Sequence, residues 1–262
     1  MAYLIVCATA FLAAGLTFFA GFGLGTLLLP AFALFFPIQV AVSATAVVHL
    51  MNNLFKLTLV GRNADLRVVL AFGIPAGLSA MLGAWLLALL SDLPVLYQYE
   101  VAGRAATITP VKLVIAILIL GFALMDILPG PTRAGFGRKW IPLGGLLSGL
   151  LGGLSGHQGA LRSAFLIKSG LTKEAFIGTG VTCAVLVDVS RLTVYGFSFL
   201  SGHLATLGEG NGLALLLAST AAAFGGTLLG SRLVRKVTLV ALQRTVGIML
   251  MVVATAMGLG LI

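Results

Sequence analysis

Residues 152–166 combine two features that rarely occur together in an apolar helix. Four glycines weaken the helix, each by roughly 1 kcal/mol relative to alanine, and they are Gly152, Gly153, Gly156 and Gly159. Three polar residues lie among them, His157, Gln158 and Arg162. An arginine at the centre of a membrane helix costs roughly 2.5–3.5 kcal/mol on insertion scales. The stretch therefore predicts a broken helix that faces a wet cavity.

A helix that starts after this break would carry free N–H groups and the positive end of its dipole. That end favours an anion, and the Gln158 amide and the Arg162 guanidinium would complement an oxyanion. A matching Gly-rich stretch, Gly21-Phe-Gly-Leu-Gly25 with Gly23 at its centre, predicts a second helix start in the first half. The alternative is close helix packing through small residues, with Arg162 at the membrane interface.

Residues 45–56 place a polar stripe on one face of an apolar helix. Spacings of 4, 3, 1 and 3 separate its members, which are Thr45, His49, Asn52, Asn53 and Lys56. Because lipid offers no hydrogen-bond partners, such a stripe is expected to face a neighbouring helix or a water-filled path. Two interpretations follow: the stripe lines a pathway, or it holds helices together while Lys56 snorkels to the interface.

The corresponding block of the second half carries Thr179 and, further along, Asp188 and Arg191. Asp188 and Arg191 are three residues apart, which is the spacing of an ion pair within a helix. The pair could be a structural clamp. The functional alternatives are that Asp188 takes up a proton for coupling or that Arg191 attracts an anion.

Composition and spacing argue against other classes of protein. Hydrophobic residues make up 60% of the 262 residues and charged residues 9%, against about 25% charged in a typical soluble domain. The net charge of +9 comes from Lys and Arg in short loops, as the positive-inside bias predicts, and not from a nucleic-acid surface. The three histidines, His49, His157 and His203, are too scattered for a metal site. We therefore expect no metal, no cofactor, no nucleic-acid partner and no catalytic constellation.

Apolar blocks of membrane length recur along the whole chain. Two of them are interrupted, Tyr3–Phe36 by Gly21, Gly23, Gly25 and Pro30, and Ile141–Ile167 by the stretch described first. The others are Gln39–Val60, Leu66–Leu90, Pro110–Leu128, Ala175–Tyr195, Gly212–Val234 and Thr245–Ile262. Between Leu90 and Pro110, residues 97–109 alternate loosely around a central glycine and predict a short β-hairpin outside the membrane.

The two halves of the sequence resemble each other. Thr45 corresponds to Thr179 at a shift of 134 (179 − 45), Gly21 to Gly156 at 135, and Gly83 to Gly230 at 147. We predict internal repeats at 1–128 and 141–262, joined by a loop at 129–140, within one integral membrane domain covering 1–262. If the interrupted blocks are hairpins that enter and return, all basic loop clusters share one side of the membrane and the repeats are inverted. Plain spans would divide those clusters between both sides.

These residues resemble the TauE/SafE family of sulfite and organosulfonate exporters. The resemblance rests on Gly21-Phe-Gly-Leu-Gly-Thr-Leu-Leu-Leu-Pro30, its degenerate repeat at Gly156, the Thr45 and Thr179 motifs, and the total length. The second motif departs from the usual Gly-rich form that ends in proline, since it reads Gly156-His-Gln-Gly-Ala-Leu-Arg-Ser-Ala-Phe165.

The predicted fold is an all-α polytopic membrane protein of two inverted repeats, each a broken or re-entrant hairpin plus three transmembrane helices. The resemblance implies a secondary transporter in the plasma (inner) membrane that exports sulfite, a sulfonate or a related oxyanion. It is not expected to be an enzyme, and its expected partners are the anion and the bilayer, with a homodimer left open. The alternatives are an intramembrane enzyme using His/Asp acid–base chemistry and a structural subunit. The predicted substrate site comprises Gly23, Thr45, His49, Asn52, Asn53, His157, Gln158, Arg162 and Thr179, with Asp188 and Arg191 as a coupling or ion pair.

Overall fold

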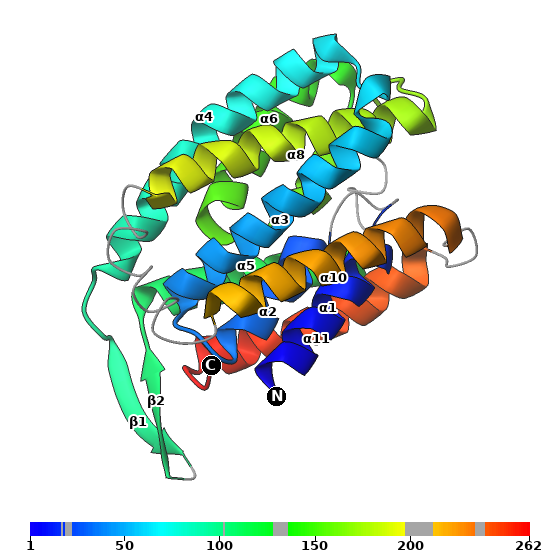
Figure 1. The fold of residues 1–262 in the computed structure, drawn as a ribbon. Coiled ribbons are helices and arrows are strands. Elements are labelled where there is room, and N and C mark those ends of the chain that lie inside the picture. Colours follow the sequence, from blue (N-terminus) through cyan, green and yellow to red (C-terminus); the bar gives the residue numbers. More distant parts are fainter. Residues whose placement is uncertain (17, 19–22, 102, 128–135, 197–211, 234–238) are drawn as a thin grey trace.

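The computed structural model describes residues 1–16, 18, 23–101, 103–127, 136–196, 212–233 and 239–262. Helices dominate it, and a two-stranded antiparallel sheet projects from one end (Figure 1). The first half contains α1 (Ala2–Leu16), α2 (Leu24–Ala33), α3 (Ile38–Val60), α4 (Leu66–Ser91), β1 (Tyr97–Val101), β2 (Arg104–Ile108) and α5 (Pro110–Ile127). The second half contains α6 (Ile141–Ser155), α7 (Gly159–Leu166), α8 (Lys173–Tyr195), α10 (Gly212–Leu233) and α11 (Leu239–Gly258).

Four of these helices are long and apolar enough to cross a membrane. They are Ile38–Asn63 (α3 with the following 3-10 turn), Leu66–Ser91, Lys173–Tyr195 and Gly212–Arg232. Shorter apolar helices accompany them, at Ala2–Leu16, Leu24–Ala33, Pro110–Met125 and Gly247–Gly258. The predicted class, an all-α membrane protein with a small external hairpin, is confirmed.

The glycine-rich stretch at 152–159 reverses the direction of the chain. Helix α6 ends at Gly156, whose φ of 80° lies in the left-handed region that favours glycine. After it, α7 packs back along α6, since the Ser148 hydroxyl donates to the Gln158 carbonyl oxygen at 2.7 Å. Further along, a Cβ at Gly144 would lie only 2.6 Å from the Phe165 Cβ. Helices α6 and α7 therefore form a helical hairpin, as the first of the two predicted alternatives requires; that the hairpin enters and leaves on one side of the membrane stays a prediction.

The first interrupted block divides in the same way. Helix α2 follows Gly23, which has a φ of 118°, and packs against α1. The predicted break at Gly21 lies outside the described residues. Each half of the chain thus has the same order, a broken pair of short helices followed by three longer ones.

The basic loops gather at one end of the bundle. The backbone N–H of Asp65, before α4, donates to the Thr179 hydroxyl at 2.9 Å, and the Phe136 ring stacks on Phe165 at 4.2 Å between centroids. The β-hairpin lies at the opposite end beside the C-terminus, where the Thr107 N–H donates to the Gly260 carbonyl at 3.1 Å (Figure 1). Described basic residues stand at the ends of the helices that Figure 1 draws on this side. Arg62 and Arg67 lie at the turn from α3 to α4, Arg138 and Lys139 before α6, Lys168 and Lys173 at the turn from α7 to α8, and Arg232 in the last turn of α10. This common end agrees with the inverted arrangement; Arg133, Arg235 and Lys236 lie outside the described residues.

Two helix pairs join the halves through glycines. In the α4–α6 pair, Gly83 packs against the backbone of Leu150. In the α1–α10 pair, Gly230 packs against the backbone of Gly15. Each residue of one contact corresponds to a residue of the other at a shift found in the sequence. Gly83 corresponds to Gly230 at a shift of 147, and Gly15 corresponds to Leu150 at a shift of 135. This reciprocal packing supports the predicted duplication, whose boundaries stay a prediction.

Two predicted boundaries are corrected. Helix α11 runs from Leu239 to Gly258 and not from Thr245 to Ile262, because the chain turns at Gly260, with a φ of 72°, to meet β2. In the β-hairpin, the sequence alternation predicted a second strand over residues 105–109, but Tyr97 pairs with Ile108 and Val101 with Arg104, so β2 begins one residue earlier. Gly103, with a φ of 76°, permits this tight turn.

The α4–α6 contact gives a stability prediction. Gly153→Ala would place a Cβ 2.8 Å from the Ala80 carbonyl carbon, so we expect the free energy of unfolding to fall by about 1–3 kcal/mol. Thermal unfolding in detergent measures it. The control is Gly121→Ala in α5, where a Cβ would meet no atom within 4 Å and no loss is expected. Equal stability of the two variants would contradict the close α4–α6 contact.

Candidate anion-binding site

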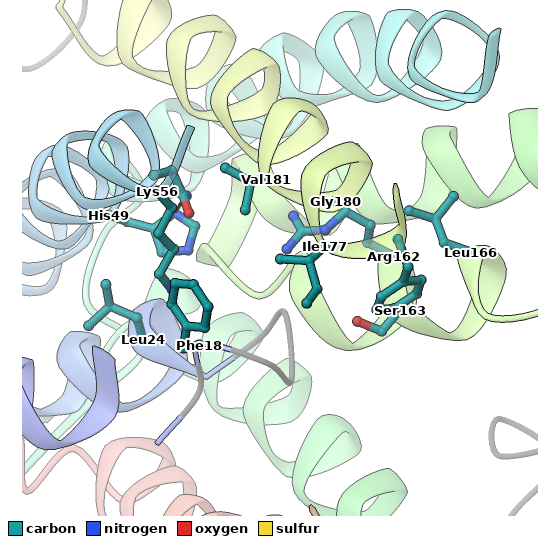
Figure 2. A pocket seen from close by; sticks show the side chains of 12 residues that line it. Phe18, Leu24, His49, Lys56, Arg162, Ser163, Leu166, Ile177, Gly180 and Val181 are labelled. Carbon is teal, nitrogen blue, oxygen red and sulfur yellow. Dashed lines mark hydrogen bonds between the residues drawn. The ribbon is translucent and has the colours of Figure 1, made fainter. Parts of the chain in front are cut away.

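A cavity lies between α3, α7 and α8, on the side of the hairpin tips that faces the basic end of the bundle. It encloses about 500 Å³, including its open mouth. Figure 2 shows Lys56 and His49 on one wall, with Phe18 and Leu24 beneath them, and Arg162 and Ser163 on the other. The complete lining is Phe18, Leu24, His49, Asn53, Lys56, Arg162, Ser163, Leu166, Phe176, Ile177, Gly180 and Val181.

Lys56 brings an ammonium group into this cavity. It lies one turn before the end of α3, and 6% of the residue is exposed. Among the described residues its Nζ makes no hydrogen bond or ion pair, and its contact is with the Phe18 ring, 5.5 Å from the centroid. The interpretation of Lys56 as a snorkelling interface residue is therefore wrong. The lysine is instead buried in the cavity, beside the Phe18 ring.

Arg162 brings a second cation from the opposite wall. It lies in α7, is 4% exposed, and its Nη1 donates to the Gln158 side-chain oxygen at 3.1 Å. Helix α7 is the second helix of the α6–α7 hairpin and packs inside the bundle, and its polar residues Arg162 and Ser163 line the cavity. The alternative of a purely interfacial arginine is not what the structure shows.

Asp188 is the centre of a buried hydrogen-bond network beside the cavity. Its Oδ2 accepts from His49 Nδ1 at 2.6 Å and from the Asn53 amide at 3.0 Å. Its Oδ1 accepts from the Gln158 amide at 3.1 Å and from Arg191 Nε and Nη2 at 3.1 and 2.8 Å. One fully buried carboxylate thus joins α3, the tip of the α6–α7 hairpin and α8.

The predicted pair of Asp188 with Arg191 is confirmed, and Arg191 has a further structural task. Its Nη1 donates to the Gly152 carbonyl oxygen at 3.3 Å, and one turn later the Tyr195 hydroxyl donates to the Gly153 carbonyl. The Gly152 carbonyl also accepts from the Gly156 N–H at 2.9 Å, so the two bonds from α8 hold the last turn of α6, where carbonyls begin to lack helical partners. Arg191 is therefore a clamp for the hairpin and does not line the cavity.

The start of α2 meets the end of α6 beside the His49 ring. A Cβ at Gly25 would lie 3.4 Å from the Gly156 carbonyl oxygen and 3.5 Å from Cδ2 of the His49 ring. Gly23 stands just before, at the start of α2, and is not in the cavity lining. The start of α2 therefore packs against the end of α6 next to the His49 ring.

Several residues predicted for the site lie elsewhere. His157 stacks on Phe122 of α5 at 5.6 Å between centroids, and its Nδ1 bonds to the Ser155 carbonyl. Asn52 accepts from the Thr227 hydroxyl at 2.7 Å and so links α3 to α10. Thr179 caps the turn before α4, and Thr45 is buried with no hydrogen bond from its hydroxyl to a described residue.

The structure thus divides the predicted set by role. His49, Asn53 and Arg162 line the cavity, and Gln158 binds both Arg162 and Asp188 from behind it. Lys56, Phe18 and Ser163 are lining residues that were not in the predicted set. The sequence could have indicated Lys56 as a lining residue, since it lies one helical turn after Asn53 on the face that carries His49 and Asn53.

The charges of this region favour an anion. Two cationic side chains and no carboxylate belong to the lining, and the nearby Asp188 is already bound by His49, Asn53, Gln158 and Arg191. Burying positive charge is costly, and an anionic ligand between the two cationic side chains offsets that cost. The described residues contain no group of His, Cys, Asp and Glu that could hold a metal ion.

Comparison with protein families gives one match. The model of the family described as "Sulfite exporter TauE/SafE" matches residues 6–257, which is nearly the whole chain. Neither the curated proteins nor the solved structures give a significant match. The four long apolar helices agree with a membrane transporter. The chain belongs to the sulfite exporter TauE/SafE family.

Proposed function

We propose that this protein is a secondary transporter that exports a small oxyanion, sulfite or a sulfonate, and that the anion binds in the cavity between Lys56 and Arg162. The observation that carries the proposal is this pair of buried cations, on opposite walls of a cavity that has no carboxylate in its lining. The family to which the chain belongs is named for the export of sulfite. A related carboxylate would meet the same charges.

The cavity walls give each end of the anion a different partner. On one side Lys56 acts as a compact point charge, while the planar guanidinium of Arg162 suits two oxygens of one oxyanion. His49 and Asn53 add polar groups next to Lys56. Because the Gln158 oxygen accepts from Arg162, the guanidinium has a fixed orientation before the anion arrives, which lowers the cost of ordering it on binding.

Alternating access is proposed to start from the conformation described here. The lining extends from the hairpin tips toward the end of the bundle with the basic loops, which the positive-inside bias assigns to the cytoplasm. On the other side, the start of α2 at Gly25 packs against Gly156. Rocking one half against the other would separate these tips and release the anion outward. The proposed location is the inner membrane, crossed several times by the chain.

Flux measurements test this function. The purified protein is reconstituted into liposomes, and the liposomes are loaded with one radiolabelled anion at a time: sulfite, a sulfonate, acetate or phosphate. We expect saturable efflux of sulfite or the sulfonate above that of protein-free liposomes. No flux of any anion, together with turnover of a lipid or peptide by the same preparation, would favour the intramembrane enzyme instead.

Lys56→Gln is expected to weaken binding of the transported anion by about 30-fold or more, because truncating one charge of a desolvated pair costs about 2 kcal/mol or more. Equilibrium binding to the purified protein measures this effect. The control is Lys168→Gln, which removes an exposed lysine at the same end of the bundle. Equal affinities of the two variants would contradict the place given to Lys56.

A further inference from the structure

We propose that His49 is a proton-binding site, and that one proton on its Nε2 is carried together with each anion. The inference rests on the proposed function, since it concerns the same cavity. It goes beyond that function because it assigns the coupling ion, the group that binds it and the direction of coupling.

The network around Asp188 fixes the tautomer of His49. The Nδ1 atom lies 2.6 Å from Asp188 Oδ2, a distance that requires the Nδ1 proton to be donated to the carboxylate. The Asn53 amide donates to the same Oδ2 at 3.0 Å. With Nδ1 protonated, the lone pair of a neutral ring is on Nε2, at the opposite edge.

Nothing in the described part of the chain occupies that second nitrogen. No hydrogen bond joins Nε2 to a described residue, and the ring edge that carries it faces Gly25, where a Cβ would lie 3.9 Å from Nε2. His49 belongs to the cavity lining. The free acceptor is therefore available to a proton that enters through the cavity.

The groups that face His49 are few and can be named for each neighbouring element. Its own helix α3 presents Lys56 and Asn53, α7 presents Arg162, and α8 presents Asp188 with its partner Arg191. Helix α2 contributes Leu24 and Gly25, and α10 meets α3 through Phe224 and Thr227, none of which titrates.

These neighbours make the proton depend on the anion. With the cavity empty, a proton on His49 would add a fourth cation to Lys56, Arg162 and Arg191, against the single carboxylate of Asp188. A bound anion offsets one of those charges and favours the protonated ring. By linkage, the proton must then raise the affinity for the anion by the same factor. The two ligands therefore bind together and move in the same direction.

The consequence is a transport cycle without net charge for a monovalent anion. One proton and one monoanion cross together, so the anion gradient and the pH gradient drive the flux and a membrane potential does not. Export then follows an outward gradient of the anion. Between the pH at which the empty site loses its proton and the higher pH at which the occupied site loses it, the affinity for the anion is expected to fall by up to about tenfold per pH unit, the limit for one linked proton.

The test uses a sulfonate, 2-hydroxyethanesulfonate, because its charge does not change between the pH values compared. Proteoliposomes carry a pH-sensitive dye inside, and valinomycin with potassium sets the membrane potential independently of pH. We expect a pH gradient to drive uptake of the radiolabelled sulfonate at zero potential, with one proton moved for each sulfonate. At equal pH on both sides, a potential is expected to leave the flux unchanged.

Sulfonate flux that follows the potential and moves no protons would overturn the proton site while leaving the anion transporter intact. Absence of sulfonate flux at every pH and potential would overturn both proposals. In His49→Gln, residual flux should follow the potential and lose its response to the pH gradient. The control His157→Gln, a histidine outside the cavity lining, should keep one proton per sulfonate; its loss there would contradict the assignment to His49.

Discussion

Arg162→Ala is expected to weaken sulfite binding by about 100-fold or more and to abolish measurable efflux. The substitution removes a buried guanidinium from one wall of the cavity, and loss of one partner of a desolvated charge pair costs about 2–5 kcal/mol. It also removes the donor to the Gln158 side-chain oxygen. Titration of sulfite into the purified variant measures the affinity, and efflux from proteoliposomes measures transport.

Two further variants separate charge from shape at this position. Arg162→Lys keeps the charge but loses the planar fork, so we expect an affinity between those of the wild type and Arg162→Ala. Arg67→Ala removes an exposed arginine from the basic end and should bind sulfite as the wild type does. Unchanged affinity in Arg162→Ala, with normal folding, would refute the proposed site.

Asp188→Asn is expected to lower the free energy of unfolding by about 3–5 kcal/mol, the effect of breaking a buried ion pair by removing one partner. Arg191 would lose its carboxylate partner in a fully buried position, and His49 would lose the acceptor for its Nδ1 proton. The remaining amide offers only one acceptor oxygen. The midpoint of thermal unfolding in detergent is the measurement.

Asp92→Asn is the matched control for Asp188→Asn, because Asp92 is an exposed carboxylate after the end of α4. Its unfolding midpoint should stay within a degree or two of the wild type, since surface substitutions usually change stability by less than about 0.5 kcal/mol. If Asp188→Asn were as stable as Asp92→Asn, the network would not hold α3, α8 and the α6–α7 hairpin together.

The fold could be predicted from the sequence because membrane helices leave clear patterns. Long apolar blocks gave the spans, and a glycine with the left-handed conformation stands at Gly156, where the break was predicted. The distribution of Lys and Arg favoured hairpins over plain spans. The contacts of Gly83 and Gly230 then follow the shifts of the internal repeat. These features depend on local composition, which a single sequence contains.

The site was predicted only in part, for a physical reason. The sequence shows which polar residues share a helix face, but it does not show which helix the face meets. Asp188 was paired with Arg191 because three residues separate them, whereas its bonds to His49 and Asn53 cross 139 and 135 residues. His157 and Asn52 are as polar as His49, yet they contact α5 and α10. Only the packing of the helices distinguishes them.

The most direct test of the central claim is sulfite binding to the purified protein when both cations of the cavity are removed together. We expect the wild type to bind one sulfite per chain in calorimetry, and Lys56→Gln/Arg162→Gln to show no saturable binding while its thermal unfolding stays cooperative. Lys168→Gln/Arg67→Gln, which removes two exposed cations from the same end, should bind as the wild type does. Sulfite binding of equal affinity in the two double variants would contradict the proposed site.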